Sequence, residues 1–202
     1  MKIYSFIRTY SPSEQGDTLM QGHTPTWYVM PESSVLRSGN PFFVPDFDTE
    51  FKAYPSLCLR IGRLGKGIAP RFVSRYIDGW TMSVAVVAAD RLRTLREEGE
   101  PWTDAVSFDR SCWIGNLQPI DSLINYDAFT IECSHTSAVY TAGNIFPAKE
   151  ELISLLSRNN TLKNGDLVLI GLLPDGITLT PGTRMHIQSA NKDIELIDIN
   201  IK

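Results

Sequence analysis

The whole chain consists of short apolar segments separated by turn residues. This pattern is the strongest constraint on its possible folds. Segments rich in β-branched and aromatic residues, bounded by Gly, Pro and Asn, are typical of strands. We expect strands over residues 2–9, 26–30, 42–44, 56–62, 81–89, 166–170, 185–187 and 194–199, with one or two more within 120–137. Residues 11–26 and 45–55 are expected to be irregular connections.

Only short helices are expected between these strands. The clearest runs from Pro147 to Arg158, because Pro suits the first helical position and Glu150 and Glu151 suit the positive N-terminal end. Shorter helices are expected over residues 70–77 and 90–98. Together with the strands they predict an α+β fold, formed by a single domain over residues 1–202.

The length and charge of the chain exclude several classes of protein. A chain of 202 residues, 43% hydrophobic and 21% charged, can bury a full core without disulfide or metal support. The formal net charge of −4 gives no electrostatic footprint for nucleic acid or an anionic membrane, so neither is expected as a partner. The longest apolar stretch, Val84 to Ala89, is too short to span a bilayer, and residues 1–10 are typical of a strand rather than a signal peptide.

The cysteines indicate a reducing environment. Cys58, Cys112 and Cys133 lie far apart in the sequence and form no CxxC pair. They are interpreted as small core residues, and we therefore expect a cytoplasmic protein.

Common motifs of metal and phosphate chemistry are missing from the sequence. His23, His135 and His186 are widely separated, so isolated surface or hydrogen-bonded histidines are favoured over a metal site. Residues 62–67 (GRLGKG) lack the spacing of a P-loop and the Ser or Thr that would bind magnesium, so a tight turn is the favoured interpretation.

A series of short motifs follows a defined order from residue 2 to the end of the chain. They are Arg8-Thr9-Tyr10, Met30-Pro31 with residues 33–36, Ile61-Gly62, residues 76–81 (YIDGWT), Pro101-Trp102, residues 107–109 (SFD), residues 145–147 (IFP), residues 151–153, 156–157 and 161–166, and Gly171. In this order and spacing the chain resembles the fumarylacetoacetate hydrolase superfamily.

The resemblance implies a mixed β-roll with a few short helices, usually as a homodimer. It also implies a magnesium or manganese ion held by two glutamates of an E-x-E motif and one aspartate. In that family the ion chelates a small 2-oxo acid or β-diketone, and hydrolysis, decarboxylation, hydration or keto–enol isomerisation follows in different members. Magnesium prefers hard carboxylate oxygens, which is why such a site needs acidic residues.

The positions of this chain that correspond to the family's functional residues carry other side chains. The metal glutamates fall on Tyr54 and Ser56, and the metal aspartate falls on Ala85. Further functional positions of the family fall on Ala89, Leu92, Val106, Leu172, Ser13 and Gly16. The only nearby substitute for E-x-E is Asp48-x-Glu50, six residues earlier. None of the family's functional positions keeps its chemistry, so we expect a degenerate site that holds no metal or other cofactor.

Two functions follow, with a third left open. The first is a metal-free family member that acts in binding or assembly, as a homodimer and with a small acid as a candidate ligand. The alternative is a hydrolase, isomerase or decarboxylase that acts on a small 2-oxo or dicarbonyl acid through a rearranged site. Its candidate polar groups, beside Tyr54 and Ser56, are Arg60, Ser83, Asp90 and Asp104. Arg60 either meets a carboxylate ligand or pairs with a nearby acidic residue at a sheet edge. A purely structural domain is the third interpretation.

Overall fold

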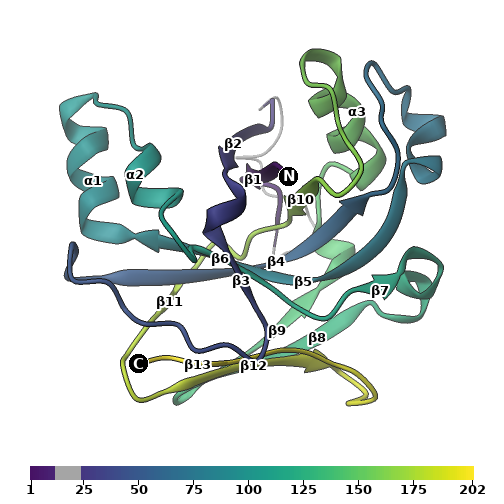
Figure 1. Cartoon of the computed structure of the whole chain (residues 1–202). Coiled ribbons are helices and arrows are strands. Elements are labelled where there is room, and N and C mark those ends of the chain that lie inside the picture. Colours follow the sequence, from purple (N-terminus) through teal and green to yellow (C-terminus); the bar gives the residue numbers. More distant parts are fainter. Residues whose placement is uncertain (12–23) are drawn as a thin grey trace.

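The computed structural model, which describes residues 1–11 and 24–202, contains two β-sheets with a few short helices around them (Figure 1). The larger sheet, of nine strands in the described residues, has the order β2-β1-β10-β4-β5-β6-β3, with β11 beside β4 and β7 beside β5. Its strands are β1 (Ile3–Ile7), β2 (Thr26–Met30), β3 (Val35–Arg37), β4 (Phe51–Ile61), β5 (Ile77–Ala88), β6 (Cys112–Ile114), β7 (Gln118–Pro119), β10 (Leu167–Ile170) and β11 (Ile177–Thr178). The smaller sheet has the order β13-β12-β8-β9. Its strands are β8 (Ala128–Cys133), β9 (Thr136–Thr141), β12 (Arg184–Ser189) and β13 (Glu195–Asn200).

Two long antiparallel strands, β4 and β5, form the centre of the larger sheet. Because side chains alternate between the faces of a strand, this pair supplies two different cores. Leu59 and Trp80 point to the face covered by the smaller sheet, where the Trp80 ring lies 5.7 Å from that of Phe129. Cys58 and Ala85 belong to a smaller core on the opposite face.

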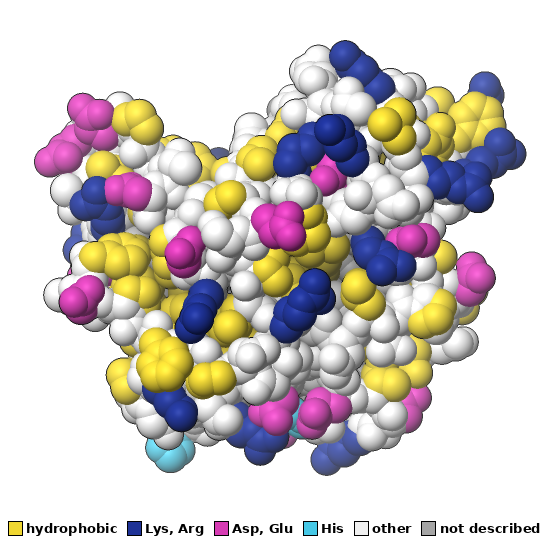
Figure 2. Space-filling view, in the orientation of Figure 1, with side chains coloured by type: hydrophobic (Ala, Val, Ile, Leu, Met, Phe, Trp, Pro, Cys, Tyr) yellow, Lys and Arg dark blue, Asp and Glu magenta, His cyan; other side chains and the backbone are white. Residues whose placement is uncertain are grey.

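The helices lie at the two ends of these long strands. In Figure 1, α1 (Ala89–Glu98) and α2 (Thr103–Val106) stand at one end, and α3 (Lys149–Asn159) stands near the other. Short 3₁₀ helices occur at Glu32–Ser34, Pro70–Arg75, Ile120–Asn125 and Ala142–Asn144. Figure 2 shows acidic side chains gathered over the α1 end and basic ones over the α3 end, with the surface hollowed between the two.

The predicted fold class is confirmed: the chain is a mixed α+β structure with a curled sheet and few short helices. The expected helix 147–158 corresponds to α3, which buries Leu152, Ile153 and Leu156. The expected strands 56–62 and 81–89 are the paired parts of β4 and β5. The cysteines are free thiols in buried positions.

Part of the expected irregular connection over residues 45–55 is wrong, because β4 already begins at Phe51 and runs through Pro55. On one edge, β4 pairs with β10 as far as Leu57 and with β11 from Ala53. Residue 55 lies between these two paired stretches and has no partner strand on that edge. The Pro55 carbonyl accepts a hydrogen bond from the loop residue Leu173 on that side, and no strand there needs the N–H that proline lacks.

Other local expectations are also corrected. Residues 42–44 form no strand, because only Phe42 makes a single bridge, to Ile201. The helix expected over 70–77 is a 3₁₀ turn ending at Arg75, with Phe72 37% exposed. His135 lies in the turn between β8 and β9 rather than in a strand. His23, Ser13 and Gly16 lie outside the described residues.

In the part of the chain that the structure describes, no helix is both long and apolar enough to cross a membrane.

Replacement of Gly115 by alanine should destabilise the fold, because this glycine lies where the two sheets meet. A Cβ atom there would lie 2.5 Å from the Leu196 carbonyl oxygen and 2.6 Å from the Thr81 hydroxyl. Such overpacking costs about 1–3 kcal/mol, so Gly115→Ala should lower the midpoint of thermal unfolding by several degrees. The matched control is Gly143→Ala, whose Cβ would meet no atom within 4 Å. Equal midpoints for the two variants would contradict the close contact between the sheets.

Candidate functional site

A cavity of about 590 Å³ opens at one end of the larger sheet, beside α1. Its walls come from the end of β1, from β2, β4 and β5, from α1 with the segment that follows it, and from the loop between β10 and β11. The lining side chains are mostly aromatic and aliphatic, with two arginines: Ile7, Arg8, Tyr10, Tyr28, Tyr54, Val87, Leu92, Arg96, Trp102, Val106, Leu172, Leu173 and Pro174. We call it the aromatic pocket.

Four of the residues predicted from the family resemblance line the aromatic pocket, and others lie next to it. Those on the wall are Tyr54, Leu92, Val106 and Leu172. Ala85 pairs directly with Tyr54 across β4 and β5, and it is fully buried in the core with which Tyr54 and Leu172 pack. Ala89, which was also predicted, is the first residue of α1, and its N–H donates to the Glu50 carbonyl at 2.8 Å.

The two predicted serines face one another in the sheet. Ser56 and Ser83 pair across β4 and β5, and their hydroxyl oxygens are 2.8 Å apart. Both side chains are fully buried, and Ser83 also lies within hydrogen-bond distance of the Ser56 carbonyl, at 3.3 Å. These hydroxyl groups satisfy each other and do not line the aromatic pocket.

The charged members of the predicted residual site are not part of the pocket lining. Arg60 makes two hydrogen bonds to the carboxylate of Asp78, at 2.8 and 3.1 Å, so it has the ion pair that the sequence left open as one alternative. Asp104 accepts hydrogen bonds from Arg91 on the surface of α1. In both cases the charge of each group is already balanced by its neighbour.

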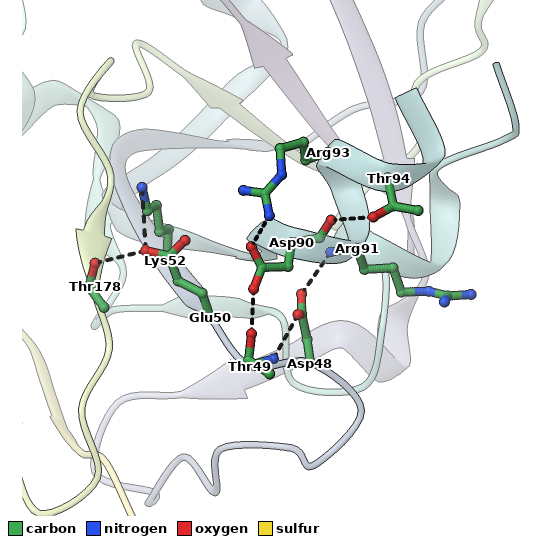
Figure 3. A network of polar contacts seen from close by, with 9 residues as sticks. All are labelled: Asp48, Thr49, Glu50, Lys52, Asp90, Arg91, Arg93, Thr94 and Thr178. Carbon is green, nitrogen blue, oxygen red and sulfur yellow. Dashed lines mark hydrogen bonds and ion pairs between the residues drawn. The ribbon is translucent and has the colours of Figure 1, made fainter. Parts of the chain in front are cut away.

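Asp90 belongs to a polar network at the start of α1 (Figure 3). Its carboxylate accepts hydrogen bonds from Thr49 and from Arg93, which hold its pKa below the usual range. The neighbouring Asp48 accepts the N–H of Arg91 at 3.0 Å and so binds the free N-terminal end of the helix. The network therefore anchors α1, which forms one wall of the aromatic pocket.

Asp48 and Glu50 do not act together as an E-x-E pair. Figure 3 shows Asp48 turned toward α1 and Glu50 turned toward Lys52 and Thr178. The Lys52 ammonium lies 3.5 Å from the Glu50 carboxylate. The two carboxylates therefore serve different neighbours.

The aromatic pocket contains nine further residues that the sequence interpretation did not assign to a site, among them Arg8, Tyr10, Tyr28, Arg96 and Trp102. Signals for most of these five were present in the sequence. Arg8 and Tyr10 belong to one of the family-like motifs and Trp102 to another, and Arg96 follows Leu92 by four residues and so lies on the same face of α1. Tyr28 joins them only through the fold.

Two phenols of the aromatic pocket, those of Tyr28 and Tyr54, are neutral at neutral pH. Burial raises the pKa of Tyr54, and the charges of Lys52 and Arg96 offset only part of this rise. Burial also raises the pKa of Tyr28 well above its usual range. The positive charge of the pocket comes from its arginines, and the guanidinium of Arg96 lies 5.6 Å above the ring of Trp102.

The three residues that the motif resemblance assigns to the family's metal positions do not offer the ligands of a divalent ion. Tyr54 offers a neutral phenol, Ser56 offers a hydroxyl that is already paired, and Ala85 offers a methyl group. Among residues 1–11 and 24–202, no group of three or more His, Cys, Asp or Glu side chains is placed to hold a metal. Magnesium and manganese need carboxylate oxygens, which Tyr54, Ser56 and Ala85 do not supply.

The fold and the pocket define a curled-sheet protein whose aromatic pocket lies over the central strands. Comparison with known proteins identifies the family to which the chain belongs. The family model described as "Fumarylacetoacetate (FAA) hydrolase C-terminal" matches residues 11–196. The chain therefore belongs to the fumarylacetoacetate hydrolase family, as its motifs indicated.

Similar proteins include enzymes that act on oxo acids. A mitochondrial oxaloacetate decarboxylase of Dictyostelium discoideum is 27% identical over 158 residues, covering 76% of this chain and 72% of that protein. An oxaloacetate tautomerase of Escherichia coli (strain K12) is 24% identical over 163 residues, covering 76% and 71%. A fumarylpyruvate hydrolase structure from Pseudomonas aeruginosa, in complex with Mn²⁺ and pyruvate, has a TM-score of 0.85 at 21% identity, covering 100% of this chain and 90% of that one. The last likeness shows the fold alone.

We predict that magnesium and manganese do not bind at Tyr54, Ser56 and Ala85. A dication placed there would lack its anionic partners, so calorimetric titration with either metal should give no binding heat at micromolar concentrations. Neither metal should raise the thermal unfolding midpoint, as an ion bound only to the folded state would. Micromolar affinity that is lost in the Ser56→Ala variant would overturn this prediction.

Asp90→Asn should destabilise the protein at neutral pH and have less effect in acid. The folded-state pKa of Asp90 is lowered, so its stabilising effect is present above the unfolded-state pKa of about 3.9 and is lost as the pH falls through the folded-state value. The difference between the urea midpoints of wild type and variant should therefore shrink from pH 7 to pH 3. Asp109→Asn, which replaces an exposed aspartate outside this network, is the control. A difference for Asp90→Asn that stays constant over this range would contradict the assigned role.

Proposed function

We propose that this chain binds a small 2-oxo or dicarbonyl acid in the aromatic pocket, using arginine in place of the family's metal ion. The observation that carries the proposal is the charge of the described lining, which contains Arg8 and Arg96 and no Asp, Glu, His or Lys. A guanidinium forms two parallel hydrogen bonds with a carboxylate and remains charged at any physiological pH. An anion in this pocket would therefore meet only favourable charge from the lining side chains.

The position of the pocket supports the same proposal. Tyr54 and Leu172 occupy positions that correspond, by the motif resemblance, to functional residues of the family, and both line this cavity. The similar proteins named above act on oxaloacetate or fumarylpyruvate, which are anionic oxo acids. The negative charge of such an acid would be attracted by the arginines of the pocket.

Turnover of the bound acid is the second candidate function, and it is favoured by the named relatives, which are enzymes. Decarboxylation of a 3-oxo acid makes the fewest demands on the residues present. The carbon–carboxylate bond breaks, the neighbouring ketone becomes an enolate, carbon dioxide leaves, and water then protonates the carbon. A guanidinium beside the enolate oxygen stabilises the charge that develops there. Tyr54 and Tyr28 are neutral phenols with raised pKa values, so they are poor general bases for isomerisation.

If the protein binds the acid but does not convert it, we propose a role in binding or assembly. In that case we propose a homodimer whose aromatic pocket holds the acid as a ligand. This part of the proposal rests on the family and on the missing carboxylates at Tyr54, Ser56 and Ala85.

Arg96→Gln should weaken the binding of oxaloacetate and pyruvate about tenfold or more, because a charge-assisted hydrogen bond is lost. The measurement is calorimetric titration, followed by assays of oxaloacetate decarboxylation and tautomerisation with added magnesium and with chelator. The matched control is Arg93→Gln, which removes the same charge from the same helix at a residue that pairs with Asp90 outside the pocket.

The outcomes separate the proposals. Conversion that persists in chelator and is lost in Arg96→Gln would support metal-independent turnover. Conversion that requires magnesium would overturn the metal-free proposal. Equal affinities in Arg96→Gln and Arg93→Gln would overturn acid binding at the aromatic pocket.

A further inference from the structure

We infer that the acid bound by this pocket carries a flat aromatic body, so that an aryl 2-oxo acid of the phenylpyruvate type binds more tightly than a compact acid such as pyruvate or oxaloacetate. This inference rests on the proposed function, since it assumes that the aromatic pocket binds an acid. It concerns the part of the ligand that lies beyond the carboxylate.

The first observation is the size of the cavity. At about 590 Å³ it falls in the range of pockets that enclose drug-sized ligands, roughly 300–1,000 Å³. An acid of three or four carbons would fill only a small part of this space. The remaining lining would stay in contact with water, and the ligand would gain little from burial of apolar surface.

The second observation is the arrangement of rings on the wall. Tyr28 from β2 and Trp102 from the segment after α1 form an edge-to-face pair with centroids 5.7 Å apart and an interplanar angle of 76°. Tyr54 from β4 and Tyr10 from the segment after β1 add two more rings. Aromatic pairs of this kind contribute beyond their buried area, and an aryl ligand could extend the stack.

The third observation places the charge next to a ring. The guanidinium of Arg96 lies over Trp102, and its charge also acts on the phenol of Tyr54. An arginine that stacks on a ring keeps its N–H groups at the edge of the plane, where they can donate to a carboxylate. A ligand with its carboxylate on Arg96 would therefore have its body beside Trp102.

Aliphatic side chains from different elements complete the apolar lining. Leu92 and Val106 belong to α1 and α2, and Leu172 and Leu173 come from the loop after β10. With two arginines among mostly aromatic and aliphatic side chains, the pocket matches an amphipathic acid better than an acid that is polar throughout.

The test compares four ligands by calorimetric titration against the full chain: phenylpyruvate, 3-phenylpropionate, pyruvate and 3-phenylpropan-1-ol. Phenylpyruvate should bind at least tenfold more tightly than pyruvate, and 3-phenylpropionate should keep most of that gain. The alcohol, which has the same ring without the charge, should bind at least tenfold more weakly than 3-phenylpropionate.

Variants of Trp102, one ring of the edge-to-face pair, test whether this residue is responsible for the preference for an aromatic ligand. Trp102→Leu should lower the affinity for phenylpyruvate about fivefold or more and change that for pyruvate by less than twofold, while Trp102→Phe should restore most of the loss. The matched control is Phe72→Leu, because Phe72 is likewise stacked with arginines, at 4.8 and 4.9 Å from Arg71 and Arg75, but outside the pocket. The thermal unfolding midpoint of each variant verifies that it is folded.

The failure of this inference differs from the failure of the proposed function. Pyruvate or oxaloacetate binding as tightly as phenylpyruvate, with no effect of Trp102→Leu, would overturn the aromatic specificity and leave acid binding intact. Failure of all the acids to bind would overturn the proposed function and the inference together. Equal binding of the alcohol and of 3-phenylpropionate would show a ring site without acid recognition and would also overturn both.

Discussion

The antiparallel pairing of β4 with β5 is the interaction on which the rest of the structure depends. It holds Phe51 opposite Ala88 at one end and Ile61 opposite Ile77 at the other. Its register decides which side chains enter the large core beneath the smaller sheet and which face the aromatic pocket. A slip of one residue would exchange the two faces, and large apolar side chains such as Leu59 would then face the pocket side. The fold and the site are therefore set by the same hydrogen-bonded ladder.

The pocket side of this ladder shows how neutral side chains are accommodated at Ser56, Ser83 and Ala85. Ser56 and Ser83 bury two hydroxyls that satisfy each other, and Ala85 adds no polar atom. Three carboxylates in the same place would repel each other and would need a cation to offset their desolvation. A hydroxyl pair with a methyl group beside it carries no charge that such an ion would need to offset.

Sequence patterns predicted the regular elements well and their ends poorly. Alternation and β-branched residues located the paired parts of β4 and β5, and the apolar spacing of residues 152–156 located α3. The first part of β4 was missed because Pro55 indicates a break in a strand. Proline is accepted there because residue 55 lies between the stretches of β4 that pair with β10 and with β11. Pairing over long sequence distances decided this point, and no local signal contains it.

The sequence located only part of the lining of the aromatic pocket, because the other lining residues are brought together by the tertiary fold. Motif order alone led to Tyr54, Leu92, Val106 and Leu172, which do line the cavity. It did not lead to Trp102 as a wall residue, because the approach of the segment after α1 to β2 is set by the whole fold. Charged residues were the least predictable, since side chains such as Arg60 and Asp104 pair with whichever opposite charge the fold brings near.

The aromatic wall also depends on a residue outside it that has no side chain. Gly176, in the loop between β10 and β11, lies so close to the ring of Tyr54 that a Cβ atom there would be 2.6 Å from the ring carbon Cζ. The loop and the ring must therefore share a space that admits no further atom, and Tyr54 is held against the loop that also supplies Leu172 and Leu173 to the pocket. A phenol at residue 54 thus requires a residue without a Cβ atom at position 176. The chemistry of the wall and the backbone of the loop are consequently constrained together, and a change at either position would reshape the pocket at the point where the family resemblance places its function.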